Sequence, residues 1–239
     1  MTIELLRPPQ AVIQYDYHDL AGLMGLMTGH SDAETSSALD VLWVLYDRVL
    51  QVSPRRIDDD ERDRFFLSKG NDPKAYYAVL AATGFIEPRL LTGYGDYDSP
   101  LGLHPDRVLV PGVEASSSRG HGLPLAVGTA LGLRARGLEQ PRLWVMLGDG
   151  ELDEGANQEA VSFAGHAELN RLNVVVIDDS GSAARAAELQ RRFASEGWSV
   201  QHVDGHDHGK LELAFTGAPD NRPHAVVARV RSRQAISRS

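Results

Sequence analysis

The carboxyl-terminal half of the chain alternates short aliphatic runs with longer segments of helical periodicity. Aliphatic runs predict β-strands at residues 108–110, 143–147, 173–177, 198–203 and 224–230. Segments between them predict helices at 122–136, 154–168 and 183–196. Uninterrupted Val, Ile and Leu indicate strands that are buried on both faces, as in a parallel sheet covered by helices. We therefore predict an α/β fold, a mostly parallel sheet with helices on both faces.

The amino-terminal half is predicted to be mainly helical. Residues 1–15 are expected to form an arm, because Arg7, Pro8 and Pro9 interrupt regular structure there. Helices are expected at 16–28, 34–50 and 73–84, the first two separated by a turn-rich break. We assign residues 16–239 to one domain.

Two regions of this half are expected to be loops. Residues 58–63 are strongly acidic, and we interpret them as a solvated loop or the start of a helix. Residues 87–107 contain three prolines and three glycines. Loops of such length inside a compact domain are usually functional or disordered.

Composition narrows the classes of function. The chain is 42% hydrophobic and carries a formal net charge of −9. That charge argues against binding to nucleic acid or to an anionic membrane, since both require a positive field. The 239 residues contain no cysteine, which excludes disulfides, thiolate metal sites and a cysteine nucleophile. No apolar signal core or membrane-spanning run is present in the sequence, so we expect a cytoplasmic protein.

The first chemical signal is the turn Gly148-Asp149-Gly150, directly after a predicted buried strand. Ligands of α/β sheets bind at the carboxyl ends of the strands, where helix starts offer free N–H groups to phosphates. The glycines allow close approach to the backbone, and Asp149 can hold a cation that bridges phosphate oxygens. The next strand ends at Ser180, so Asp149 and Ser180 should lie at neighbouring strand ends. The alternative is a plain strand-to-helix turn capped by Asp149.

Further motifs extend this signal over roughly residues 16–237. They are LSKGN at 67–71, LHPDR at 103–107, PGVE at 111–114, GHGLPLAVG at 120–128, GDGELDEG at 148–155 and WSVQHVDGHD at 198–207. Together they resemble the motifs of the amino-terminal subunit of a split transketolase, a thiamine diphosphate-dependent enzyme. In that family this domain holds the diphosphate and its metal ion. The resemblance therefore implies the thiamine diphosphate-binding fold, with thiamine diphosphate and Mg²⁺ as cofactors.

The resemblance implies binding roles for individual residues. The metal ligands would be Asp149, Ser180 and, through its backbone carbonyl, Ser182. The residues that contact the cofactor would be Asn71, Ser118, Gly120, His121, Gly148, Asp149, Gly150 and Ser180.

It also implies catalytic roles for two histidines and two glutamates. His30 and His104 would line the pocket of the thiazolium ring and the substrate. Glu154 and Glu159 would lie near the subunit interface and communicate with the partner's active site. Alternatively, the histidines are solvent-exposed loop residues, and the glutamates are first-turn acids favoured by the helix dipole.

The sequence departs from the family pattern within this site. Ser180 stands where the family has an asparagine, and a short neutral hydroxyl should bind Mg²⁺ less well than an amide carbonyl. Asn71 replaces a histidine, and Arg119 in a shortened loop is either a diphosphate contact or a solvent-facing substitution. After Ser182, the residues that the family has before its next helix are missing. Residues 231–235 stand where the family has a loop with two glycines, and this sequence has neither glycine. These changes suggest a specialised enzyme rather than a pentose-phosphate transketolase.

The resemblance also implies a partner. In the family, a glutamate that pairs with the aminopyrimidine ring lies in a second, pyrimidine-binding domain, and no such domain follows here. We therefore expect the partner to be a carboxy-terminal, pyrimidine-binding transketolase subunit. We also expect a heterotetramer, and a chain that is catalytically incomplete by itself. The expected reaction transfers a two-carbon ketol unit from a small ketose donor.

Two alternatives remain open. The first is a component of a 2-oxoacid dehydrogenase-like system that passes a two-carbon unit from a 2-oxoacid to a lipoyl or carrier protein. The second is a degenerate, non-catalytic subunit retained for assembly.

Overall fold

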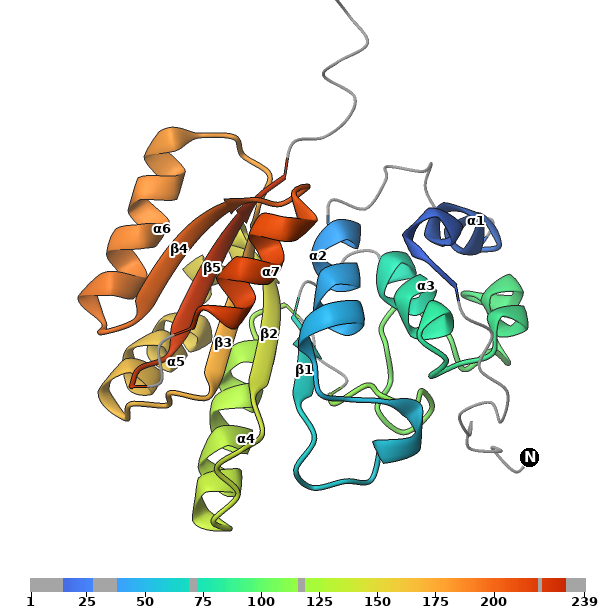
Figure 1. Ribbon diagram of the computed structural model, residues 1–239, viewed down its shortest axis with the longest axis horizontal. Coiled ribbons are helices and arrows are strands. Elements are labelled where there is room, and N and C mark those ends of the chain that lie inside the picture. The colour runs from blue at the N-terminus through green and yellow to red at the C-terminus, as the bar shows by residue number, and fades with distance from the viewer. Residues whose placement is uncertain (1–14, 28–37, 69–72, 116–118, 219–220, 231–239) are drawn as a thin grey trace, which may run out of the picture.

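The computed structural model contains a parallel β-sheet with helices on both faces (Figure 1). It describes residues 15–27, 38–68, 73–115, 119–218 and 221–230. The sheet has the strand order β1-β2-β3-β5-β4, and every neighbouring pair is parallel. The strands are β1 (Arg64–Leu67), β2 (Leu143–Gly148), β3 (Leu172–Asp178), β4 (Ser199–Asp204) and β5 (His224–Arg229). This arrangement confirms the predicted fold class.

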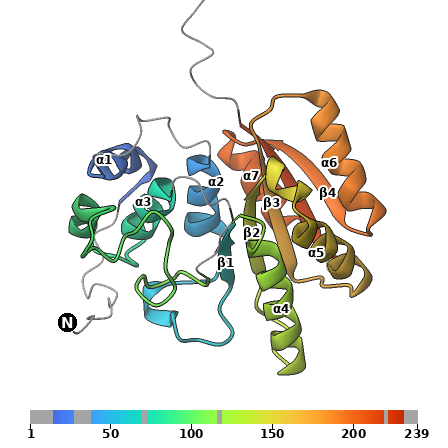
Figure 2. The same ribbon diagram turned by 180° about the vertical axis from the view of Figure 1, so that it is seen from behind.

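The strands divide their side chains between two cores. Trp144 and Met146 of β2 face the core formed with α1 (Leu20–Gly25), α2 (Leu39–Val44), α3 (Lys74–Ala82) and α7 (His208–Thr216). Val145 and Leu147 face the opposite core, formed with α4 (Gly122–Ala135), α5 (Gly155–His166) and α6 (Ala183–Ser195). Successive strand residues point to opposite faces, and because both faces are covered, the middle of each central strand is apolar on both sides. Figures 1 and 2 show α1, α2 and α3 grouped beyond β1, at the end of the sheet away from β4.

The expected strand at 108–110 is wrong. The Asp106 carboxylate accepts a hydrogen bond from Val108 N at 2.7 Å, and the Asp106 carbonyl accepts one from Val110 N at 2.9 Å. Aspartate bonds of this kind stabilise turns, and Val108 is 69% exposed. The strand that pairs with the outer edge of β2 is instead β1, which the sequence pattern did not indicate.

Within the described residues, α1 and α3 are shorter than the helices expected at 16–28 and 73–84, and the start of the helix expected at 34–50 lies outside the described residues. A 3-10 turn at Tyr17–Asp19 precedes α1, and a π-helical stretch at Leu45–Val49 follows α2. Helix α7 was not predicted; Asp207 caps it by accepting from Lys210 N at 3.0 Å. Most of the expected arm lies outside the described residues. Among the helices that the structure describes, none combines the length and apolar character needed to cross a lipid bilayer.

The acidic segment at 58–63 ends on a buried carboxylate. Asp63 lies 2.7 Å from Nη2 of Arg142, and its other oxygen accepts from Arg142 N at 2.8 Å. These contacts join the starts of β1 and β2, which are paired from Arg64 and Leu143 onward. The interpretation of this segment as a solvated loop is therefore wrong for Asp63.

At the other end of the same two strands, the buried side chain of Glu151 joins three segments. Its Oε2 accepts from Ser68 Oγ at 2.7 Å and from Gly120 N at 3.2 Å, while Oε1 accepts from Gly148 N at 3.2 Å. Ser68 follows β1, Gly148 ends β2, and Gly120 precedes α4. A buried carboxylate requires such donors, because burial of an unpaired charge is costly. The carboxylate thus fixes the ends of two strands relative to the start of a helix.

Two glycines permit this close packing. A Cβ at Gly122 would lie 2.5 Å from Cβ of Ser68, which leaves no room for any other residue. Gly120 has a φ of 81°, a conformation that L-residues rarely adopt. These positions explain structurally why glycines stand at both ends of the GHG sequence before α4.

We expect Glu151→Gln to lower the free energy of unfolding by about 1–3 kcal/mol, because the amide would turn N–H groups toward donors that already point at this side chain. Chemical denaturation of the chain measures the change. The matched control is Glu139→Gln, the same substitution at a residue in the loop before β2. It should stay within about 0.5 kcal/mol of the unsubstituted chain. Equal stability of the two variants would contradict the network.

Candidate functional site

The predicted binding residues gather where β2 and β3 end. Gly148 pairs with Ile177 across these adjacent strands, so Asp149 and Ser180 leave the sheet at the same edge. A 3-10 turn at Asp149–Asp153 leads from β2 into α5, and a short loop leads from β3 into α6. The juxtaposition expected from the sequence is therefore present in the structure.

Asp149 forms an ion pair with Arg185, a residue to which the sequence analysis gave no role. Nε of Arg185 lies 3.3 Å from Oδ2 of Asp149, and its Nη2 donates to the Asp149 carbonyl at 2.8 Å. The guanidinium also contacts Asp153 at 3.4 Å and Glu188 at 3.0 Å. Partial burial lowers the pKa of Arg185, but the surrounding carboxylates raise the pKa by more than burial lowers it. The net pKa of Arg185 therefore lies above its ordinary value. A permanent positive charge therefore lies beside Asp149.

The two serines among the predicted metal ligands have other partners. Ser180 Oγ donates to Oδ1 of the buried Asp178 at 2.5 Å, and it accepts from Ser182 N at 3.2 Å. Ser182 Oγ accepts from Arg185 N at 3.3 Å and caps α6, and the Ser182 carbonyl, which is the predicted ligand atom, accepts from Ala186 N at 3.0 Å. Both hydroxyls thus shape the loop between β3 and α6.

These contacts show that the donor set does not fit Mg²⁺ as it stands. Asp149 is paired with a cation, and the hydroxyl proton of Ser180 is directed at another carboxylate. In the part of the chain that the structure describes, no group of three or more His, Cys, Asp or Glu side chains is spaced to hold a metal ion.

A second arginine approaches the turn from the loop before α4. Arg119 Nη2 donates to the Gly150 carbonyl at 3.3 Å, and its Nε lies 3.0 Å from Oε1 of Glu154. Its side chain is 65% exposed. Arg185 and Arg119 thus bring two positive charges to consecutive carbonyls of the glycine turn. Guanidinium groups bind phosphate oxygens through paired N–H donors, so the exposed Arg119 side chain suits an anionic diphosphate, whereas Arg185 is bonded to Asp149, Asp153 and Glu188.

The remaining predicted residues are less closely associated with the turn. His121 lies directly before α4, and Gly120 contacts Glu151. His104 is exposed in a loop and Glu159 is exposed on α5; within the described residues, no hydrogen bond or ion pair joins either to the turn. His30, Asn71 and Ser118 lie outside the described residues.

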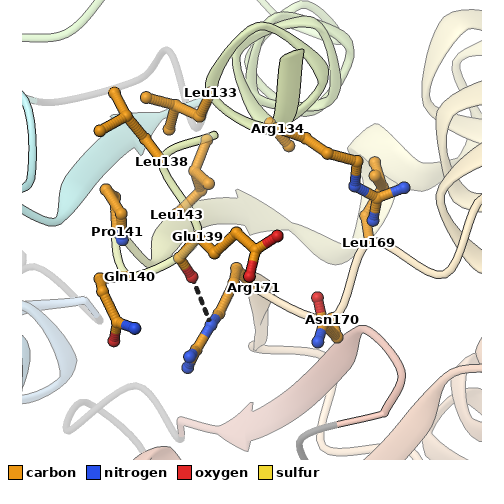
Figure 3. Close-up of a pocket in the computed structure, with 11 residues that line it drawn as sticks. Leu133, Arg134, Leu138, Glu139, Gln140, Pro141, Leu143, Leu169, Asn170 and Arg171 are labelled. Carbon is orange, nitrogen blue, oxygen red and sulfur yellow. Dashed lines mark hydrogen bonds between the residues drawn. The ribbon is translucent and has the colours of Figure 1, made fainter. Parts of the chain in front are cut away.

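A pocket of about 280 Å³ lies at the opposite end of the sheet (Figure 3). Its walls include Leu143 at the start of β2 and Leu169 just before β3. Arg171 donates to the Glu139 carbonyl at 2.9 Å, and Arg134 donates to the Ala167 carbonyl at 2.9 Å. Since the length of β2 separates this pocket from the glycine turn, it is not part of the candidate site.

Comparisons with known proteins agree with this geometry. A family model described as "Transketolase, thiamine diphosphate binding domain" matches residues 25–233. One relative, from Actinobacillus succinogenes, is named as a subunit of an apulose-4-phosphate transketolase. It is 33% identical over 87% of this chain and 78% of its own length. A protein named Ferredoxin fas2, from Rhodococcoides fascians, is 49% identical over 95% of this chain and 76% of its own length. The present sequence has no cysteine, and so lacks the thiolates that hold an iron–sulfur cluster.

Solved structures show the same fold. Transketolase from Leishmania mexicana matches 91% of this chain with a TM-score of 0.75 and 26% identity, and a Pichia stipitis transketolase variant matches 90% with a TM-score of 0.76 and 26% identity. The chain spans only 37% and 36% of those longer proteins. With the sheet order, the glycine turn and the family match in agreement, the chain belongs to the transketolase family and carries its thiamine diphosphate binding domain.

Proposed function

We propose that this chain is the amino-terminal, diphosphate-binding subunit of a split transketolase-like enzyme that moves a two-carbon ketol unit. The observation that carries the proposal is the glycine turn at the edge of β2 and β3, with Arg119 and Arg185 beside it. When bound, thiamine diphosphate supplies the chemistry that breaks and forms the carbon–carbon bond. The residues of this chain bind and orient the diphosphate end through arginine donors and through N–H groups at helix starts.

The proposed donor is a ketose with an anionic group. Two relatives are named for apulose 4-phosphate and for 6-deoxy-6-sulfo-D-fructose, both of which are charged. The 2-oxoacid dehydrogenase-like alternative, with its carrier protein, is not favoured, because several relatives of similar length are named transketolase subunits. The same names disfavour a purely structural subunit.

The catalytic roles of individual residues stay proposals. His30 and His104 would contact the substrate, and Glu154 and Glu159 would face the partner. Magnesium would be held by Asp149, Ser180 and Ser182 only if Arg185 left Asp149 and the Ser180 hydroxyl turned away from Asp178. We also propose a cytoplasmic location for the enzyme.

The partner subunit is proposed to cover the outer face of α4 and α5. Leu125 on α4 is 45% exposed and Phe163 on α5 is 49% exposed, and nothing lies within 4 Å of a Cβ placed at Gly128 on α4. Exposed apolar surface of this kind is typical of an interface. Both helices begin beside the glycine turn, so a pyrimidine-binding subunit on this face would close the site. Two copies of each subunit would form the proposed heterotetramer.

The isolated chain is expected to turn over no ketose, because the glutamate that pairs with the aminopyrimidine ring is supplied by the partner. The pair should be active. The measurement is aldehyde release from a panel of ketose phosphates and sulfonates in the presence of thiamine diphosphate and an aldose acceptor for the two-carbon unit, for the two subunits separately and for both together. Steady turnover by this chain without its partner would contradict the split-subunit proposal.

Leu125→Arg is expected to weaken association with the partner about tenfold or more, because it places a charge within the apolar contact. The control is Leu213→Arg on α7, at a leucine that is 73% exposed and away from this face. It should leave association unchanged. Light scattering of the mixed subunits measures both, and equal assembly of the two variants would place the interface elsewhere.

A further inference from the structure

The short loop after β3 determines what lies next to Asp149. Ser182 caps α6, so the helix begins at Ala183 and Arg185 lies in its first turn. From that position, the Arg185 side chain contacts both the carboxylate and the carbonyl of Asp149. The short connection between β3 and α6 therefore brings a permanent positive charge to the Asp149 carboxylate, which could otherwise bind a metal ion.

A divalent cation would have to displace this arginine. Nε, Nη1 and Nη2 of Arg185 all donate, and the acceptors include Asp149, Asp153 and Glu188. Charge-assisted bonds of this kind are stronger than neutral ones. A cation that bound Asp149 alongside Arg185 would instead meet a like charge at short range. Ser180 offers little compensation, because its proton is directed at Asp178.

Arg119 adds a second positive group on the next carbonyl of the turn. It is bound through Nη2 and Nε, and its largely exposed side chain leaves donors directed at solvent. The donors of Arg119 that are not bound to Gly150 or Glu154 can reach a diphosphate, and Arg185 would add donors by exchanging Asp153 and Glu188 for phosphate oxygens.

We propose that Arg185, assisted by Arg119, takes the charge-neutralising role of the metal ion, so that thiamine diphosphate binds to the assembled enzyme without a divalent cation. This inference rests on the proposed function for the identity of the ligand. Arg185 would be a cofactor-binding residue, and Asp149 would orient its guanidinium rather than coordinate a metal.

The direct test is calorimetric titration of thiamine diphosphate into the assembled two-subunit enzyme, after treatment with chelator. Titrations in EDTA and in excess Mg²⁺ are expected to give dissociation constants within about twofold of each other. Binding that weakens tenfold or more in EDTA and recovers with Mg²⁺ would overturn the inference. Absence of binding in both buffers would overturn the proposed function, and this inference with it.

Single substitutions test whether Arg185 is the residue responsible for metal-independent binding. Arg185→Gln is expected to weaken binding in EDTA about tenfold or more, because a charge-assisted contact is lost. Arg191→Gln is the matched control, an exposed arginine on the same helix, and should bind like the unsubstituted enzyme. Equal affinities for these two variants would overturn the role of Arg185. If Arg185→Gln does not fold, the exposed residue Arg119 is substituted instead, as Arg119→Gln. Weaker binding of thiamine diphosphate by Arg119→Gln than by the Arg191→Gln control would support the arginine site. Equal binding by these two variants would contradict it.

Discussion

One buried carboxylate, that of Glu151, holds the diphosphate end of this domain together. Its two oxygens accept from the end of β1, the end of β2 and the loop that leads into α4. All of these partners are hydrogen-bond donors, so the negative charge of Glu151 is stabilised without a cation. Asp149 leaves the sheet beside this carboxylate, and Arg119 precedes Gly120, which is bound to it. The positions of the glycine turn and of the first arginine thus depend on one side chain.

The position of Arg185 depends on a different constraint, the length of the loop between β3 and α6. With Ser180 bonded to Asp178 and Ser182 capping α6, the chain has no slack between strand and helix. Arg185 must then face the end of the neighbouring strand β2. The same residues that resemble a metal site consequently form an arginine site, although each of them stands where the sequence predicts.

The parts of the fold with the strongest hydrophobic pattern could be predicted from sequence. β2 and β3 are largely apolar runs, and they were expected within a residue or two of their ends. β1 was not, because four residues that start with Arg64 carry too little pattern to identify a strand. The sequence at 108–110 has that pattern but forms a turn, because Asp106 binds the backbone that follows it.

For the candidate site too, the sequence predicted one part of the geometry and not the other. Parallel neighbouring strands place Asp149 and Ser180 at one edge, and periodicity suffices to expect this. The start of α6 at Ala183 was predicted, but the partner of Asp149 was not, because it depends on which face of that helix Arg185 occupies. The available signal was the short stretch between the predicted strand at 173–177 and the predicted helix at 183–196, since a short connection keeps the helix start close to the strand ends.

Arginine, and not a metal ion, is proposed to neutralise the charge of the diphosphate beside the glycine turn. The decisive measurement is a crystal structure of the assembled enzyme with thiamine diphosphate, grown in Mn²⁺ and measured at the manganese absorption edge. We expect no anomalous peak beside Asp149, with Arg185 still bound to that residue and in contact with the diphosphate. An anomalous peak coordinated by Asp149 and Ser180, with Arg185 displaced, would contradict it.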